Sequence, residues 1–540
     1  MPPQRNRRSL GSSPILRSQC ALPCSQGHRI VHGFPRITRN SQVRGVYQLI
    51  NRRELLAGSA AFYLTSQLAF GAVDDFQVVN DIHSQLNRTR VDRILRPKNV
   101  KELQAAVLTA KSAKKPLSIA GGRHAMGGQQ FGTDMILVDM TGLDQIVSFD
   151  PQRGLVEVQA GAFWPEFTTA YLRRQQGASR QWGFAQKQTG ADNISIGGTL
   201  AANAHGRGLS MQPFVSNIES FTLVDADGKL VPCGRQQNPE LFRLVIGGYG
   251  LFGVVSSVTL RLVPRQKIER IVEVREVDGL MNAFAERIRS GFLYGDFQFA
   301  IDPASDDFLH KGVFSCYRPV DPATPMPPKE KSLSDESWRT LLYLAHEDKK
   351  QAFRRYADYY LSTNGQLYWS DTHQMSIYPN NYHREIDKKE HAKNPATEII
   401  TEINVPREAL SSFLAEVRDD FRKNHVELIY GTIRLIEKEK ESFLPWAKES
   451  YACTIFNIDT VHTPEGIQHS AEAFRRLIDM AAKRHGTYYL TYHRFARREQ
   501  VLACYPNFAE FLKLKKEYDP TGRFQSDWYR HCQVLFGEAV

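Results

Sequence analysis

The chain contains a glycine-rich segment with one histidine near its middle. Residues 119–131 read IAGGRHAMGGQQF, so His124 stands among four glycines. Glycine-rich loops let the backbone approach a bound molecule closely, and their successive N–H groups hold the oxygens of a pyrophosphate. The segment therefore predicts a nucleotide-binding loop, and the chemistry of its histidine depends on what that loop holds.

Two further segments of small residues follow. Residues 193–210 read NISIGGTLAANAHGRGLS, and a later loop has the spacing Gly248-x-Gly250-x-x-Gly253. That spacing is formally a dinucleotide fingerprint, which needs a strand before it and a helix after it. Here PELFRLVI predicts a helix before the loop, and VVSSVTLRLV predicts a strand after it. The reversed order excludes a nicotinamide site of the Rossmann type and favours a different nucleotide.

The elements around these loops alternate between helix and strand. Apolar residues at helical spacing predict a helix within residues 99–113, with Asn99 as its cap. KPLSIAGG (115–122) is typical of a buried strand that runs into the first glycine loop. Residues 225–228, Asp-Ala-Asp-Gly, predict the turn of a hairpin. We therefore expect a β/α mixture with loops at strand ends, where ligands tend to bind.

The pattern changes after Pro264. Residues 318–337 are rich in proline and lysine and predict a surface loop. Longer strands and helices follow, among them a strand expected over TYYLTYHRFA (487–496). This half of the chain predicts a second, α+β domain.

The charge of the chain is concentrated at one end. Of the formal net charge of +11, most lies in residues 1–72, which hold ten arginines, no lysine and one acidic residue. The rest is close to balanced, which argues against nucleic-acid binding. The seven cysteines are scattered and show no metal-ligand spacing, so we expect no metal site.

Residues 1–72 are typical of a targeting leader. Arg52-Arg53 stands just before an uncharged, mildly apolar run over 55–73, and AFGA (69–72) offers small residues for cleavage. The run is too polar for a membrane span, so we expect no stable span in the mature chain. The arginine pair is similar to a twin-arginine export signal, which predicts an exported, periplasmic protein. An organelle transit peptide is the competing interpretation.

Three glycine loops in this order, with a hairpin between the second and third, resemble those of the vanillyl-alcohol oxidase family of flavoproteins, which has the PCMH-type FAD-binding fold. The loops are similar to those of cytokinin dehydrogenases, and the tail pattern YP…F…DP…F…S is similar to that of aldonolactone and alditol oxidases. The resemblance implies an α+β chain. A PCMH-type FAD-binding domain of two α/β subdomains would span 73–264, and an α+β substrate (cap) domain 265–495. Residues 496–540 would return to complete the FAD domain.

The resemblance also implies which residues hold FAD. In many members, a histidine at the place of His124 is bonded covalently to the flavin 8α-methyl group, although a plain contact is the alternative. Thr189 and Gly190 fall near the position that controls oxygen access in relatives. The remaining implied FAD contacts are Gly121, Gly122, Arg123, Ala125, Met126, Gly127, Gly128, Gln129, Gly197, Gly198, Thr199, Asn203, Gly206, Gly208, Gly248, Gly250, Gly253 and Val255.

The catalytic residues are less clearly marked. Sugar-oxidising relatives often carry a lysine shortly before the YP motif, and here Tyr492 stands at that place beside His493. This departure puts a sugar or polyol substrate in doubt and makes Tyr492 or His493 the candidate base for a substrate hydroxyl. A histidine titrates closer to neutral pH. Strict alternation along a strand, however, would let only one of the two face the site.

Two charged residues are expected on central strands of the second domain. Glu402 resembles the acidic residue of a strand in alditol oxidases, and Arg434 resembles the arginine of their next catalytic strand. Because an unpaired buried charge is costly, these side chains either pair with each other or meet ligand.

The resemblance implies an FAD-dependent enzyme that transfers hydride from a CH–OH donor to flavin N5. The donor is a small molecule such as a sugar, polyol or lactone, and oxygen or another acceptor takes the electrons. CH–NH oxidation, as in cytokinin dehydrogenases, is an alternative. Reduction of a C=C bond and a non-catalytic flavin-binding role remain open.

Overall fold

The structure is a computed structural model that describes residues 77–376, 379 and 381–537. They belong to one compact unit, Asp74–Val540. The predicted leader, with Arg52-Arg53, lies outside the described residues. Within the described part, none of the helices combines the length and the apolar character needed to span a membrane.

The first glycine loop leaves the end of a small parallel sheet. Asn99 caps the helix beside this sheet by accepting a hydrogen bond from the Glu102 backbone, as predicted. Leu103 and Val107 of that helix are fully buried against Leu117 and Ile136 of the strands. The elements are β3 (Arg93–Leu95), β5 (Ile136–Asp139) and β4 (Leu117–Ala120), in that order, with α2 (Val100–Ser112); a two-stranded sheet pairs β1 (Gln77–Val79) with β2 (Thr89–Val91).

A six-stranded antiparallel sheet carries the second and third glycine loops. The predicted hairpin joins its first two strands at a turn where the Gly228 N–H donates to the Asp225 carbonyl. Its order is β10 (Leu230–Gly234), β9 (Ile218–Val224), β11 (Val254–Pro264), β7 (Leu155–Gln159) and β6 (Ile146–Asp150), with β8 (Trp182–Phe184) on β11. The helices of this region are α3 (Trp164–Arg174), α4 (Ile196–Ala201) and α5 (Pro239–Val245).

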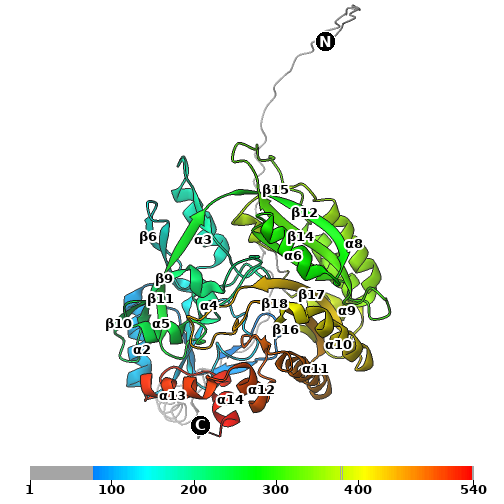
Figure 1. Cartoon of the computed structure of the whole chain (residues 1–540). Helices are drawn as coiled ribbons and strands as arrows, with labels where there is room; N and C mark the ends of the chain where they lie inside the picture. The colour runs from blue at the N-terminus through cyan, green and yellow to red at the C-terminus, as the bar shows by residue number, and fades with distance from the viewer. Residues whose placement is uncertain (1–76, 377–378, 380, 538–540) are drawn as a thin grey trace, which may run out of the picture. The chain divides into compact units, whose positions relative to one another are not determined.

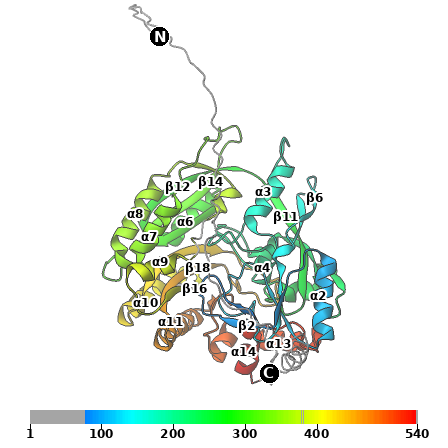
Figure 2. The same ribbon diagram turned by 180° about the vertical axis from the view of Figure 1, so that it is seen from behind.

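The second half of the chain is built on an eight-stranded sheet. Its order is β15 (Leu367–Trp369), β12 (Lys267–Glu276), β14 (Lys311–Pro319), β13 (Tyr294–Phe299), β17 (Leu428–Ile436), β18 (Tyr451–Val461), β16 (Ala396–Pro406) and β19 (Thr487–Tyr488). The helices are α6 (Leu280–Arg289), α7 (Asp335–Glu347), α8 (Lys349–Leu361), α9 (Tyr382–Lys389), α10 (Leu410–Lys423) and α11 (Pro464–Ala482). Figure 1 and Figure 2 show these helices gathered around this sheet, away from α2 and α3.

The two faces of this sheet pack differently. Phe314 of β14 contacts Phe284 of α6, whereas its neighbour Val313 packs with Ala357 of α8. Because successive strand residues point to opposite faces, α6 and α8 cover opposite faces of the sheet. The six-stranded sheet ends at Pro264 and the eight-stranded sheet begins at Lys267, so the chain crosses between them in two residues.

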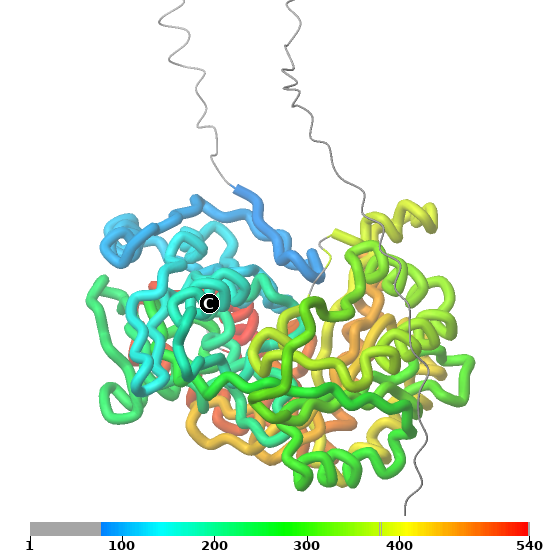
Figure 3. Tube along the Cα trace, turned by 90° about the horizontal axis from the view of Figure 1, so that it is seen from above, coloured from blue at the N-terminus to red at the C-terminus, as the bar shows by residue number. Residues whose placement is uncertain are grey.

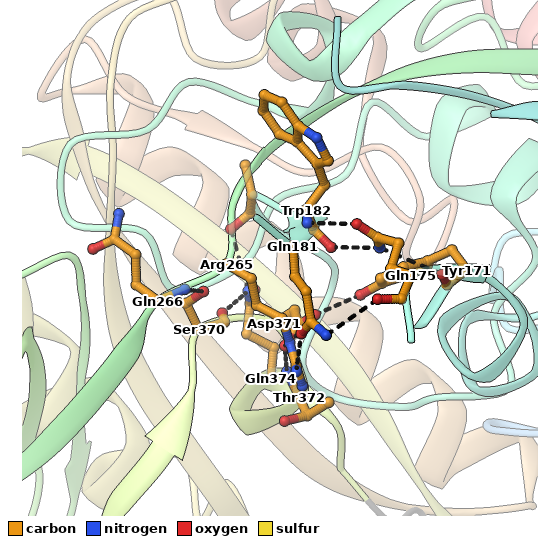
Figure 4. Close-up of polar contacts among 11 residues, drawn as sticks. Tyr171, Gln175, Gln181, Trp182, Arg265, Gln266, Ser370, Asp371, Thr372 and Gln374 are labelled. Atoms are coloured by element: carbon orange, nitrogen blue, oxygen red, sulfur yellow. Dashed lines mark hydrogen bonds and ion pairs between the residues drawn. The ribbon is translucent and has the colours of Figure 1, made fainter. Parts of the chain in front are cut away.

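A buried polar network ties this crossover to α3 (Figure 4). Asp371, which is fully buried, accepts a 2.6 Å hydrogen bond from the Tyr171 hydroxyl and a 2.9 Å ion-pair contact from Arg265 Nε. Gln374 continues the network by donating to the Ala185 carbonyl. Such a paired, hydrogen-bonded charge holds the two halves in one arrangement, because breaking it would leave a carboxylate buried and unpaired.

The C-terminal segment returns to the first sheet. Phe524 forms a bridge with Leu117 of β4, and the Leu117 N–H donates to the Arg523 carbonyl at 2.7 Å. Figure 3 shows the red C-terminal segment with the blue and cyan part of the chain. Its helices are α12 (Arg498–Cys504), α13 (Phe508–Tyr518) and α14 (Asp527–Leu535).

The strand expected over 487–496 is mostly absent. Only Thr487–Tyr488 pairs with β16, and the following residues leave the sheet. Their carbonyls accept hydrogen bonds from the first glycine loop instead: Met126 N–H to Thr491 and Gln129 Nε2 to Leu490. Contacts with this distant loop therefore override the local strand pattern.

Candidate functional site

The three glycine loops and the segment after β19 converge on one cavity. Together with the open solvent at its mouth, it amounts to about 1340 Å³ of space not filled by atoms, and its walls are largely apolar. Tyr492 is the predicted catalytic residue that lines it. The predicted cofactor residues in its wall are Gly121, Gly122, Arg123, His124, Ala125, Met126, Gln129, Gly190, Gly197, Gly198, Thr199, Gly250, Gly253 and Val255.

The other predicted cofactor residues are not among those that line the cavity. They are Gly127, Gly128, Thr189, Asn203, Gly206, Gly208 and Gly248. A Cβ atom added to Gly248 would lie 2.1 Å from the Leu244 carbonyl oxygen, and one on Gly206 would lie 2.6 Å from that of Lys187. These glycines allow protein backbone, rather than ligand, to approach. A glycine-rich pattern does not distinguish the two uses.

His124 lies in the wall with its ring largely desolvated. Burial lowers the pKa of its imidazole to about 3, and a hydrogen bond to the Asn193 backbone opposes that shift. The ring is therefore neutral at pH 7, so one of its two nitrogens is unprotonated. His83, from the segment between β1 and β2, lines the same cavity. Sequence reasoning missed it because no pattern marks an isolated histidine in a loop.

A buried lysine supports another part of the wall. Lys187 Nζ lies 2.9 Å from Asp192 Oδ1 and donates to the Gln188 carbonyl at 2.6 Å. Its side chain is fully buried, and desolvation lowers its pKa to about 8. Gln188 and Ala191, between the two charges, line the cavity. The ion pair thus closes the 187–192 loop around the cavity, a role that the sequence did not reveal.

Tyr492 connects the cavity to the eight-stranded sheet. Its hydroxyl donates to Glu402 Oε2 at 3.5 Å, and burial raises the pKa of the phenol well above its ordinary value. Glu402 lies on β16 and is 2% exposed, and its other carboxylate oxygen lies 2.6 Å from His205 Nε2. The tyrosine therefore has an acceptor behind it for its own proton.

Glu402 and Arg434 do not form an ion pair with each other. Arg434 lies on β17 and is 6% exposed, and its Nε has no hydrogen-bond partner among the described residues. Its charge still acts on Tyr492, whose pKa it lowers against the effect of burial. Of the two arrangements considered from the sequence, a direct salt bridge is thus wrong, and contact between Arg434 and a ligand stays a prediction, since Arg434 is not among the residues that line the cavity.

His493 is turned away from the cavity. Its ring stacks on Phe495 with centroids 3.7 Å apart, and it is not among the residues of the cavity wall. Burial lowers its pKa to about 3. Strand alternation does not apply here, because the backbone of these residues is irregular. Tyr492 is consequently the better placed of the two candidate bases.

Several further wall residues were not singled out from the sequence. Tyr249 and Tyr489 contribute aromatic rings, Ile400 contributes an apolar side chain from β16, and Thr491 completes the wall beside Tyr492. The combination of glycine backbone, apolar side chains and few polar groups fits a nucleotide with a flat ring system, such as FAD. The buried neutral imidazole of His124 is compatible with either a contact or a bond to it.

Comparisons with known proteins agree with this geometry. Residues 91–234 match the FAD binding domain family, and residues 393–532 match the D-arabinono-1,4-lactone oxidase family. The chain is 29% identical over 213 residues to D-arabinono-1,4-lactone oxidase of Yarrowia lipolytica, covering 37% of this chain and 39% of the relative. It is 28% identical over 218 residues to L-gulono-1,4-lactone dehydrogenase of Mycobacterium tuberculosis, covering 40% and 47%.

A third match is to cytokinin dehydrogenase 7 of Oryza sativa, 28% identical over 200 residues, covering 35% of this chain and 36% of the relative. Each of these matches spans less than half of the relative's length. The two family matches contain the first two glycine loops and Tyr492 respectively. By these matches and its glycine loops, the chain is similar to the PCMH-type FAD-binding oxidoreductases, among them aldonolactone oxidases and dehydrogenases.

Proposed function

We propose that this protein oxidises a CH–OH donor of sugar, polyol or lactone type with FAD as its cofactor. The observation that carries the proposal is the convergence of three glycine loops and Tyr492 on one cavity, in a chain that matches both an FAD-binding and a lactone oxidase family. Bound FAD would accept the hydride from the donor carbon. Oxygen or another acceptor would then take the electrons.

The chain's own residues would hold FAD and handle the proton. The backbone of the first and second glycine loops would approach the cofactor, and Gly253, with its φ of +143°, permits a turn that a side chain would strain. Tyr492, with Glu402 behind it, would take the proton of the donor hydroxyl. Arg434 would stabilise negative charge near Tyr492.

The proposal includes a covalent bond between His124 and the flavin ring. A nucleophilic nitrogen must be unprotonated, and burial keeps this imidazole neutral at physiological pH. Its place in the cavity wall beside Gly122 supports attachment to the flavin ring. The link would prevent loss of the cofactor after export, which agrees with the expected twin-arginine leader and periplasmic location. Cell fractionation with the complete leader and with Arg52 and Arg53 replaced by lysine tests that location.

The decisive experiment is anaerobic bleaching of the purified yellow protein. Aldonolactones, polyols, sugars and amines would be mixed with it one at a time, and the flavin absorbance followed. Bleaching by a CH–OH donor supports the proposal. A protein that binds no FAD, or that no such donor reduces, contradicts it. His124→Ala should lose acid-stable yellow colour, and His469→Ala, an exposed position on α11, should retain it.

One observation favours a second candidate. The match to a cytokinin dehydrogenase makes CH–NH oxidation the main alternative. The same screen separates the two, because bleaching by secondary amines and by none of the hydroxyl donors would favour the amine reaction.

A further inference from the structure

A buried histidine stands behind the cavity in contact with Glu402. His205 belongs to the second glycine loop and is 3% exposed. Its Nε2 lies 2.6 Å from Glu402 Oε1, and the side chains of both residues are 2% exposed. The Trp446 and Tyr489 rings, with centroids 5.0 and 6.3 Å away, pack against the imidazole. A donor at this distance in such a dry place stabilises the ionised carboxylate strongly.

The same carboxylate reaches the cavity through its other oxygen. Glu402 Oε2 accepts the hydroxyl of Tyr492, which lines the cavity, so His205 and Tyr492 occupy opposite oxygens of one side chain. Burial keeps Tyr492 protonated at neutral pH. A protonated phenol accepts a proton from a ligand only if it passes its own proton on.

The groups around Glu402 leave His205 as its nearest donor. Tyr249, Tyr489 and Cys453 each have a pKa raised by burial, and the charge of Glu402 adds to the shift in each case. These groups are therefore neutral. Arg434 is a cation on β17, which β18 separates from the strand of Glu402, and no ion pair joins it to Glu402 among the described residues.

We propose that His205 is a positioning residue that holds Glu402 ionised and oriented as the proton acceptor for Tyr492 during donor oxidation. The inference rests on the proposed function. In the step, the donor hydroxyl proton passes to the Tyr492 oxygen as the Tyr492 proton passes to Glu402 Oε2. The donor carbon loses its hydride to the bound FAD, so the donor loses one proton and one hydride and becomes a carbonyl.

A metal ion is the competing use of this cluster. His205, Glu402 and Cys453 each offer a ligand atom, and these atoms lie within 4.8 Å of one another. Burial raises the pKa of the Cys453 thiol well above its ordinary value, however, and a thiol must be deprotonated to bind zinc. His205 Nε2 and Glu402 Oε1 are also directed at each other, 2.6 Å apart. The geometry therefore favours proton handling.

The test compares two substitutions in the holoenzyme. His205→Gln keeps an N–H that can reach Glu402, and His205→Leu removes it. We expect the leucine variant to reduce its flavin about 10- to 100-fold more slowly with donor affinity little changed, and the glutamine variant to stay within about threefold of the wild type. The pH profile of the rate should also differ between the leucine and the glutamine variant, because only glutamine can donate a hydrogen bond to Glu402. Equal rates and profiles in all three proteins would overturn the inference.

A second measurement depends neither on activity nor on the leucine variant. Nitrogen-15 NMR of the histidine-labelled wild-type protein should find His205 Nε2 protonated at neutral pH, with the signal assigned through His205→Gln. An unprotonated Nε2, or one equivalent of bound metal in the purified protein by elemental analysis, overturns the inference. A protein without FAD, or one that no donor bleaches, contradicts the proposed function instead, so the two failures are distinguishable.

Discussion

Gly121 of the first glycine loop lies against Ser195 of the second so closely that no side chain fits between them. A Cβ atom on Gly121 would stand 2.1 Å from Ser195 Oγ. That hydroxyl caps α4 by accepting the Gly198 N–H at 3.1 Å. The glycine thus sets the distance between the two loops that form the cavity.

Gly121→Ala should therefore separate the loops and abolish FAD retention. Overpacking of this kind costs about 1–3 kcal/mol in unfolding free energy, and here it acts directly on the cavity. The measurement is flavin content after gel filtration together with a denaturant melt. Gly234→Ala is the control, because its added Cβ would meet Ser220 only at 3.7 Å. Full flavin content in Gly121→Ala would refute the role given to this contact.

Lys187→Met should open the 187–192 loop. Removing one partner of a buried ion pair costs about 3 kcal/mol or more, because the remaining charge and carbonyls lose their donor. We expect lower thermal stability and faster flavin loss. Lys111→Met provides the comparison: Lys111 pairs with Asp227 at 2.7 Å, but both side chains are about half exposed, so its loss should cost less than about 1 kcal/mol. A similar loss of thermal stability in both variants would contradict the conclusion that burial makes the Lys187–Asp192 ion pair important.

Covalent attachment at His124, if it occurs, should depend little on pH. Because burial lowers the pKa of this imidazole to about 3, it stays neutral across the range from about pH 5 to 8. Apoprotein from riboflavin-starved cells would be mixed with FAD, and acid-stable yellow colour followed with time. The rate should be flat over that range. A rate that halves near pH 6.5 would reveal an ordinary, solvated histidine.

Asp459 should make the folded state sensitive to pH. Burial raises the pKa of this carboxyl to about 6, and the charge of Glu398, opposite it across β16 and β18, adds to the shift; His346 works against it. The folded protein thus keeps a proton that the unfolded chain releases near pH 4. The resulting stability is fully present below about pH 4 and is lost as the pH rises through 6.

Asp459→Asn should remove that dependence. Relative to the wild type, its unfolding free energy should rise between pH 4 and pH 7 by about 1–3 kcal/mol. Urea melts at several pH values measure the difference. Asp307→Asn, on a turn where the side chain is 44% exposed, is the matched control. A difference that stays constant from pH 4 to 7 would show that Asp459 titrates normally.

Local patterns in the sequence predicted several helices, strands and turns of the fold correctly. The helix capped by Asn99, the hairpin turn at 225–228 and the helix–loop–strand order around Gly248 all occur as predicted. Such features depend on hydrogen bonds and side-chain periodicity within a few residues, so the local sequence is enough to predict them. The glycine loops likewise revealed an FAD-binding chain before any contact was known.

The side chains that line the cavity around Tyr492 could not be predicted from the sequence in the same way. Tyr492 and His493 are neighbours, yet one lines the cavity and the other stacks on Phe495, because the backbone leaves the sheet after Tyr488. His205 and Glu402 are 197 positions apart, and only the docking of the second glycine loop on β16 brings them to 2.6 Å. The glycines also differ in what they contact. Some line the cavity, whereas others, such as Gly248, pack closely against protein backbone.

Residue types and their spacing thus established the nucleotide loops and the order of helices and strands, and the family resemblance of those loops implied FAD as the cofactor. The partners of Glu402, the direction of Tyr492 and the burial of Lys187 emerged only when distant segments packed together. The physical reason is range: periodicity and capping act over one turn or one strand, whereas desolvation and charge pairing depend on whichever segments the folded chain brings into contact.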